Sequence, residues 1–101
     1  ISLKIGITYV YLGDVYSEIQ KYDSAEIVFT EALPYFEKAS DLEYRARILA
    51  SLGQVYYRME NYKDALDRMA AALVIYRQLH NSVEAAKLEK NIEIVKKRLG
   101  T

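Results

Sequence analysis

The sequence predicts an all-α fold in which helix hairpins stack on one another, and three observations support this. Residues 12–33 and 52–73 share one pattern at a constant offset of forty positions. Apolar residues in both segments follow the spacing of amphipathic helices. The composition, 51% hydrophobic and 28% charged, is typical of a globular domain. Self-similarity at a fixed period of this size indicates a repeat architecture, in which neighbouring units bury a shared core.

The two segments match at small or apolar residues. The matched pairs are Leu12 with Leu52, Gly13 with Gly53, Val15 with Val55, Tyr16 with Tyr56, Tyr22 with Tyr62, Ala25 with Ala65, Ala32 with Ala72 and Leu33 with Leu73. Glycine inside a helix costs about 1 kcal/mol relative to alanine. Its presence at the same place in both segments therefore predicts a close helix crossing, with Ala25 and Ala65 as the small surfaces facing it.

These residues resemble the tetratricopeptide repeat, whose pattern runs Leu-Gly-x-x-Tyr and then Ala, a large apolar residue and Ala. The forty-residue offset is similar to the long variant found in kinesin light chains, spindle-orienting adaptors and bacterial regulators. The resemblance implies a right-handed α-solenoid of two antiparallel helix hairpins plus a C-terminal capping helix. We expect a single domain over 1–101, with repeat one at about 3–39, repeat two at about 41–80 and the capping helix at about 82–99.

The first helix, predicted over residues 3–19, is apolar on more than one side. One stripe at helical spacing contains Ile5, Tyr9, Leu12, Tyr16 and Ile19. A second set off that stripe contains Ile1, Leu3, Ile7, Val10 and Tyr11. We interpret the second set as a contact with a preceding repeat or with a second chain, because a helix with two apolar sides normally packs on both.

The next three helices are delimited by turn and capping residues. The second helix covers about 22–38 and has a weak N-terminus, since Lys21 stands where the second copy has Asn61. Ser40 and Glu43 form a capping box that predicts the start of the third helix, which ends near Met59. Asn61 is predicted to cap the fourth helix.

The fifth helix departs from the repeat pattern. Asn81 and Glu84 give the capping signal for a helix that opens near Ser82, and Gly100 gives its stop. It keeps one narrow apolar stripe of Ala85, Leu88, Ile92, Val95 and Leu99, and charged residues cover the rest. One apolar and one charged face are typical of the cap that ends a solenoid.

Several function classes find no support. The chain has no cysteine and one histidine, His80, which falls in a turn, so we predict no metal, no cofactor and no catalytic site. The basic cluster of Lys96, Lys97 and Arg98 fits a charged cap face better than a nucleic-acid site, since the pI is about 6.8.

No apolar run approaches the length of a membrane span, and we expect a cytoplasmic protein without membrane contact. Because the chain starts at Ile1, we expect a C-terminal fragment of a larger protein.

The resemblance also implies a concave groove lined by the first helix of each unit. Carried onto this sequence, the groove residues are Asp14, Ser17, Arg47, Gln54, Tyr57, Arg58, Lys87 and Lys90. Their basic groups suit an acidic peptide, because charged donors recognise carboxylates well. The carboxylate clamp of chaperone-binding relatives is not expected, since only Lys87 agrees among Val10, Asp14, Ser51, Lys87 and Asn91.

The predicted function is protein–protein interaction, with a peptide or helix of a partner held in the groove. Two alternatives remain open at this point. The first is a homodimer formed through the apolar N-terminal helix. The second is a regulatory domain attached to an enzyme or a transcription factor.

Overall fold

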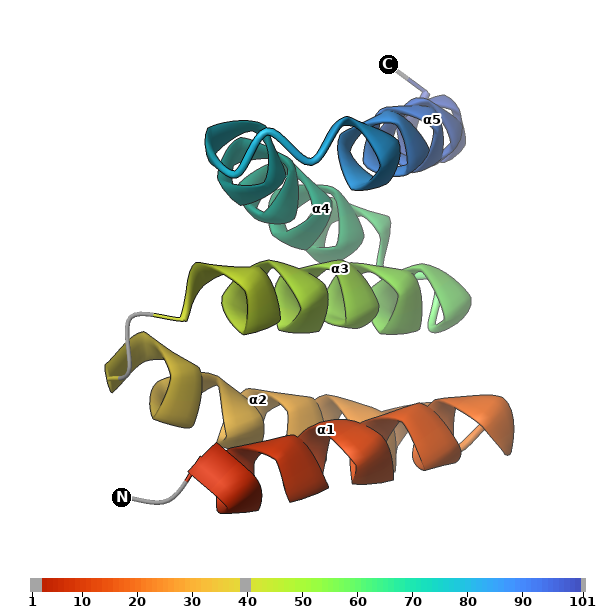
Figure 1. The fold of residues 1–101 in the computed structure, drawn as a ribbon. Coiled ribbons are helices and arrows are strands. Elements are labelled where there is room, and N and C mark those ends of the chain that lie inside the picture. The colour runs from red at the N-terminus through yellow and green to blue at the C-terminus, as the bar shows by residue number, and fades with distance from the viewer. Residues whose placement is uncertain (1–2, 39–40, 101) are drawn as a thin grey trace.

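The computed structural model describes residues 3–38 and 41–100, and over this part of the chain it shows five helices and no strand. The helices are α1 (Leu3–Glu18), α2 (Tyr22–Lys38), α3 (Leu42–Arg58), α4 (Tyr62–Gln78) and α5 (Ser82–Leu99). Each helix packs on the next in chain order, so that α1 and α2 form one hairpin, α3 and α4 a second, and α5 covers α4 (Figure 1). The prediction of an all-α solenoid is confirmed.

The turns within the hairpins, and the turn into α5, share one backbone geometry. Gln20, Glu60 and His80 have left-handed φ angles of 64°, 62° and 57°. The amide of the residue after each of them donates back to a helix carbonyl five positions earlier, as from Asn61 to Tyr56 at 2.8 Å. A residue with a left-handed φ angle commonly ends a helix, because it lets the following amides donate to the last helix carbonyls. His80 is thus an exposed turn residue, as predicted.

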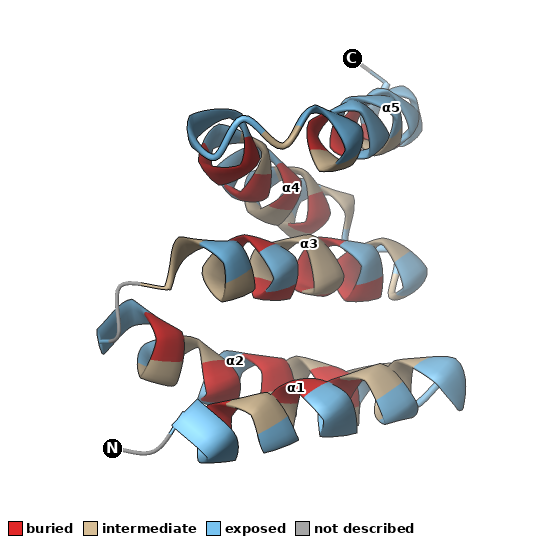
Figure 2. Cartoon of the chain, viewed as in Figure 1, coloured by how far each residue is buried: buried red, intermediate tan, exposed pale blue. Residues whose placement is uncertain are grey.

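The close crossing predicted at the two glycines is present. A Cβ on Gly13 would lie 2.5 Å from the Phe29 ring, and one on Gly53 would lie 2.6 Å from Cγ of Met69. Neither distance can accommodate a real side chain, so each glycine lets the second helix of its own hairpin approach. Ala65 also faces Gly53, through its carbonyl oxygen at 3.3 Å, whereas the nearest atoms at Gly13 all belong to Phe29. The core lies between successive helices, where Figure 2 shows the buried residues.

Only part of the apolar stripe of α1 is packed against the core. The residues of α1 that are buried against α2 are Gly6, Val10 and Gly13. The longer stripe is divided: Tyr9 and Tyr16 are half-buried against the core, whereas Ile5, Leu12 and Ile19 are exposed. The Tyr9 ring lies 6.1 Å from the ring of Tyr35 on α2. Gly6, which lies outside the repeated pattern, was not predicted to contact α2, although a Cβ there would lie 2.9 Å from Cβ of Tyr35.

The second predicted apolar set of α1 does not form one surface. Val10 is buried, Ile7 is half-buried, and Leu3 and Tyr11 are exposed. Ile1 lies outside the described residues. The set therefore wraps from the core toward solvent.

Helix capping follows the prediction in part. Asp41 is the N-cap of α3 and its carboxylate accepts from the amide of Tyr44 at 3.0 Å, while Ser40 lies outside the described residues. Asn81 caps α5 by accepting from the Glu84 amide at 3.1 Å, and Gly100 ends that helix in the left-handed region. Asn61 holds the N-cap place of α4 without a side-chain hydrogen bond, so the capping bond predicted there is wrong.

Candidate functional site

Three hollows lie along α3 and bring residues of α1 and α5 next to it. The first, at the C-terminal end of α1, is lined by Ser17, Glu18, Tyr22, Gln54, Val55 and Arg58. The second, between α3 and α5, is lined by Arg47, Ala50, Ser51, Gln54, Tyr76, Glu84, Lys87, Leu88 and Asn91. The third is lined by Gln54, Tyr57, Met69, Asn91, Ile94 and Val95. Gln54 borders all three, and we call their combined surface the groove.

Most of the groove residues expected from sequence do line these hollows. Ser17 and Arg58 share the first hollow with Gln54, and Arg47 and Lys87 share the second. Tyr57 lines the third. The residues come together because helices α1, α3 and α5 turn equivalent sides the same way.

Two expected groove residues are placed differently. Asp14 lines none of the three hollows, but it reaches the groove through an ion pair with Arg47 at 2.9 Å. Lys90 is exposed on α5 and lines none of the three hollows.

Carboxylates accompany the basic side chains of the groove. Lys87 lies 3.4 Å from the carboxylate of Glu84, one turn earlier on α5. Arg58 shares the first hollow with Glu18. Together with the pair between Arg47 and Asp14, these neighbours make the groove mixed in charge rather than uniformly basic. Exposed pairs of this kind contribute little to stability and can be exchanged for a ligand's carboxylate.

Sequence reasoning missed Glu84, Tyr22 and Tyr76 as groove residues. Tyr76 is buried at the base of the second hollow, and burial raises the pKa of its phenol, with the negative charge of Glu84 adding to the effect. Glu84 had been read only as a helix-capping residue. The repeat offset could have indicated two further groove residues. Ser51 and Asn91 stand forty positions apart, at the same repeat position, and both line the second hollow.

The groove chemistry is that of hydrogen bonding. It offers the amides of Gln54 and Asn91, the hydroxyls of Ser17 and Ser51 and several cations, which can bind the main chain and polar side chains of a peptide. Among the described residues, no group of three or more His, Cys, Asp or Glu side chains could hold a metal ion. No helix in that part of the chain has the length and apolar character needed to cross a membrane.

A comparison with protein-family models finds one that describes the tetratricopeptide repeat and matches residues 4–78. The chain belongs to the tetratricopeptide repeat family. The match covers both hairpins and stops before α5, in agreement with the loss of the repeat pattern there. A comparison with curated proteins gives no match. Tetratricopeptide repeat domains are generally protein-binding scaffolds rather than enzymes.

Proposed function

We propose that this tetratricopeptide repeat domain binds a peptide or a short helix of a partner protein along the groove. The observation that carries the proposal is the position of Gln54, which borders three adjoining hollows on the central helix. A side-chain amide both donates and accepts hydrogen bonds. Gln54 can therefore pair with the main chain of a ligand, independently of the ligand's side chains.

Cations on either side of Gln54 give the ligand a preferred composition. Arg58 lies in the hollow toward α1, and Lys87 lies in the hollow toward α5. A ligand with an acidic residue at each end can place one carboxylate near each cation, where charge-assisted hydrogen bonds form. The carboxylates already present limit this preference to ligands of moderate negative charge, since a strongly acidic peptide would meet Glu18 and Glu84.

The test is a selection of random peptides on the immobilised domain, followed by calorimetric titration of the selected peptides. We expect Gln54→Ala, Arg58→Ala and Lys87→Ala each to weaken binding by about tenfold, which is the range for one charge-assisted or main-chain hydrogen bond. Lys63→Ala is the matched control, because Lys63 is exposed on α4 and lines none of the three hollows.

Circular dichroism and thermal melting of each variant separate lost binding from lost folding. The proposal is wrong if the selected peptides bind the three groove variants as tightly as they bind the unchanged domain.

A further inference from the structure

The hydroxyl of Tyr76 on α4 has no hydrogen-bond partner among the described residues. Tyr76 is only 5% exposed, and burying a hydroxyl without a partner costs stability. In the same part of the chain, every side-chain oxygen or nitrogen that is fully enclosed has a partner. The unpaired Tyr76 oxygen is therefore not fully enclosed and opens into a hollow of the surface.

This hydroxyl lies toward the second hollow of the groove. Tyr76 lines that hollow and also a hollow at the turn between α4 and α5. Burial raises the pKa of Tyr76 above 10.0, and the charges of Glu84, Arg47 and Glu43 act on it in that order. Glu84 and Arg47 both line the second hollow. Since the raised pKa keeps the phenol protonated at neutral pH, the hydroxyl is available there as a donor.

Two residue differences between the repeats produce this arrangement. Where α2 meets α3, the rings of Phe36 and Tyr44 stack with centroids 4.6 Å apart, and Phe36 is completely buried. Forty positions later stand Tyr76 and Glu84. A phenylalanine thus fills the equivalent core position without a hydroxyl, and the ring that covers it is replaced by a carboxylate. The Tyr76 hydroxyl is therefore not required for packing.

The second hollow contains more hydrogen-bond donors than acceptors. Its volume of about 260 Å³ is below that of a usual small-molecule pocket and suits a single side chain. Its carboxylate, on Glu84, already accepts from Lys87 at 3.4 Å. Besides the phenol, the groups that can donate to a ligand belong to Arg47, Ser51, Lys87 and Asn91.

We propose that Tyr76 determines the specificity of the groove, by donating a hydrogen bond to the carboxylate of an acidic side chain that the partner's peptide inserts into the second hollow. This inference rests on the proposed function and deepens it by naming the group that the hollow binds. Arg47 and Lys87 attract the carboxylate, and the buried phenol fixes its position. A glutamine side chain fits less well, because its amide nitrogen brings a further donor to a hollow with few acceptors.

The experiment titrates the isotope-labelled domain with glutamate whose amino group is acetylated and whose α-carboxyl group is amidated. This capped glutamate carries its only charge on the side chain, and capped glutamine is the matched neutral ligand. At constant ionic strength we expect saturable amide shifts at Ser51, Lys87 and Asn91, and binding of capped glutamine at least tenfold weaker. The Cζ resonance of Tyr76 should shift with capped glutamate and not with capped glutamine.

A variant without the hydroxyl tests its role in recognition. Tyr76→Phe should weaken the binding of capped glutamate about tenfold and that of capped glutamine less than twofold. Its melting temperature should be unchanged or higher, because no hydrogen bond is lost and Phe36 fills the equivalent position. Tyr11→Phe is the control and should change neither affinity, since Tyr11 is exposed and lines none of the three hollows.

Three results would overturn the inference: no saturable shifts at the second hollow, equal affinity for the two capped residues, or an equal loss of both affinities in Tyr76→Phe. The last would mean that the tyrosine acts through packing alone. If any of these occurs while selected peptides still depend on Gln54 and Arg58, this inference fails and the groove proposal stands. If the selected peptides are also indifferent to Gln54 and Arg58, both fail.

Discussion

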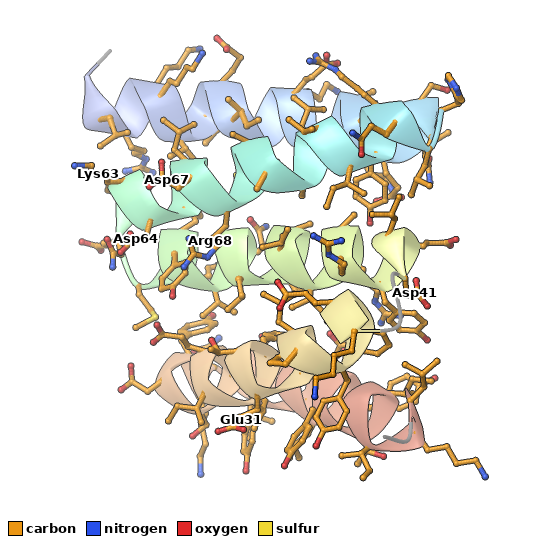
Figure 3. All side chains as sticks on the ribbon, turned by 90° about the vertical axis from the view of Figure 1, so that its left-hand side faces the viewer. Glu31, Asp41, Lys63, Asp64, Asp67 and Arg68 are labelled. Carbon is orange, nitrogen blue, oxygen red and sulfur yellow. The ribbon has the colours of Figure 1, made fainter. Side chains whose placement is uncertain are left out.

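The hydroxyl of Tyr56 on α3 donates a 2.7 Å hydrogen bond to the carboxylate of Glu26 on α2, and so joins the second hairpin to the first. The guanidinium of Arg68 lies 5.6 Å from the centre of the same tyrosine ring. Arg68 and Asp64 come from the N-terminal half of α4 (Figure 3). A single side chain therefore contacts the helices before and after its own, which makes Tyr56 a fixed point in the stacking of the two hairpins.

Removing this hydroxyl should weaken the stack. We expect Tyr56→Phe to lower the free energy of unfolding by about 1–2 kcal/mol, the usual value of a hydrogen bond to a charged group that is partly buried. Urea denaturation of Tyr56→Phe, Glu26→Gln and the double variant gives the coupling energy. Tyr11→Phe is the control, since Tyr11 is exposed. If the two single effects simply add, the two side chains do not act together.

Stability should also fall in alkaline solution through this tyrosine. Burial, and then the hydrogen bond to Glu26, raise the pKa of Tyr56 above its ordinary value of 10.0. The folded state then holds the phenolic proton more tightly than the unfolded state does. The contribution is complete below about pH 10 and is lost as the pH rises through the folded-state pKa. Denaturation between about pH 9 and pH 11 should show a steeper loss for the unchanged domain than for Tyr56→Phe; equal slopes would contradict the assignment.

Adding a methyl group at Gly13, where α1 and α2 cross closely, should lower the stability of the domain. Alanine normally favours a helix over glycine by about 1 kcal/mol, but here its Cβ would fall 2.5 Å from the Phe29 ring. Overpacking against the ring costs about 1–3 kcal/mol, so after the helix gain we expect Gly13→Ala to be destabilising by up to about 2 kcal/mol overall. Thermal melting checks this.

The matched test of that contact shortens the opposing side chain. Phe29→Leu alone should be destabilising, because it leaves a cavity. Combined with Gly13→Ala, it should cost less than the sum of the two changes. If the double variant loses as much unfolding free energy as the two single variants together, the Phe29 ring is not what excludes the methyl group.

The forty-residue repeat offset allowed most of the fold to be predicted from the sequence. Once residues 12–33 and 52–73 were aligned, the helix order and the glycine crossings followed from one pattern. The side of α3 that lines the groove was implied by the resemblance to the tetratricopeptide repeat. Arg47, Gln54 and Lys87 were placed in this way, and the structure brings them to one hollow. Periodicity predicts which side of a helix a residue occupies, and repetition predicts which helix lies opposite.

The sequence could not show what depends on neighbours rather than on spacing. Leu12 and Leu52 are the same residue at the same repeat position, yet they are 38% and 2% exposed, because only the second has a helix packed on it. Likewise, Asp14 was expected to line the groove, whereas it pairs with Arg47 across 33 residues of sequence. Ion-pair partners on different helices are set by tertiary geometry, which no local pattern records.

The two asparagine N-caps should respond differently to the same change. Asn81 accepts a hydrogen bond from the Glu84 amide, so Asn81→Ala should lower the free energy of unfolding by about 1 kcal/mol. Asn61 makes no such bond, and Asn61→Ala should cost clearly less. Urea titration of the two variants compares equivalent positions within one molecule. Equal losses would mean that Asn61 caps α4 in solution.

Releasing Arg47 from its ion pair should strengthen the binding of acidic ligands in the groove. The side chains of Arg47 and Asp14 are 44% and 38% exposed, so their pair contributes at most about 1 kcal/mol and Asp14→Asn should leave the melting temperature nearly unchanged. The freed guanidinium can then bind a ligand carboxylate, and the repulsion from Asp14 is gone. We expect about fivefold tighter binding of an acidic groove peptide by calorimetry, and a smaller gain at high salt because the added interaction is exposed and screened. A neutral peptide of the same length is the control. An equal gain for both peptides would show that Asp14 acts on the shape of the groove rather than on its charge.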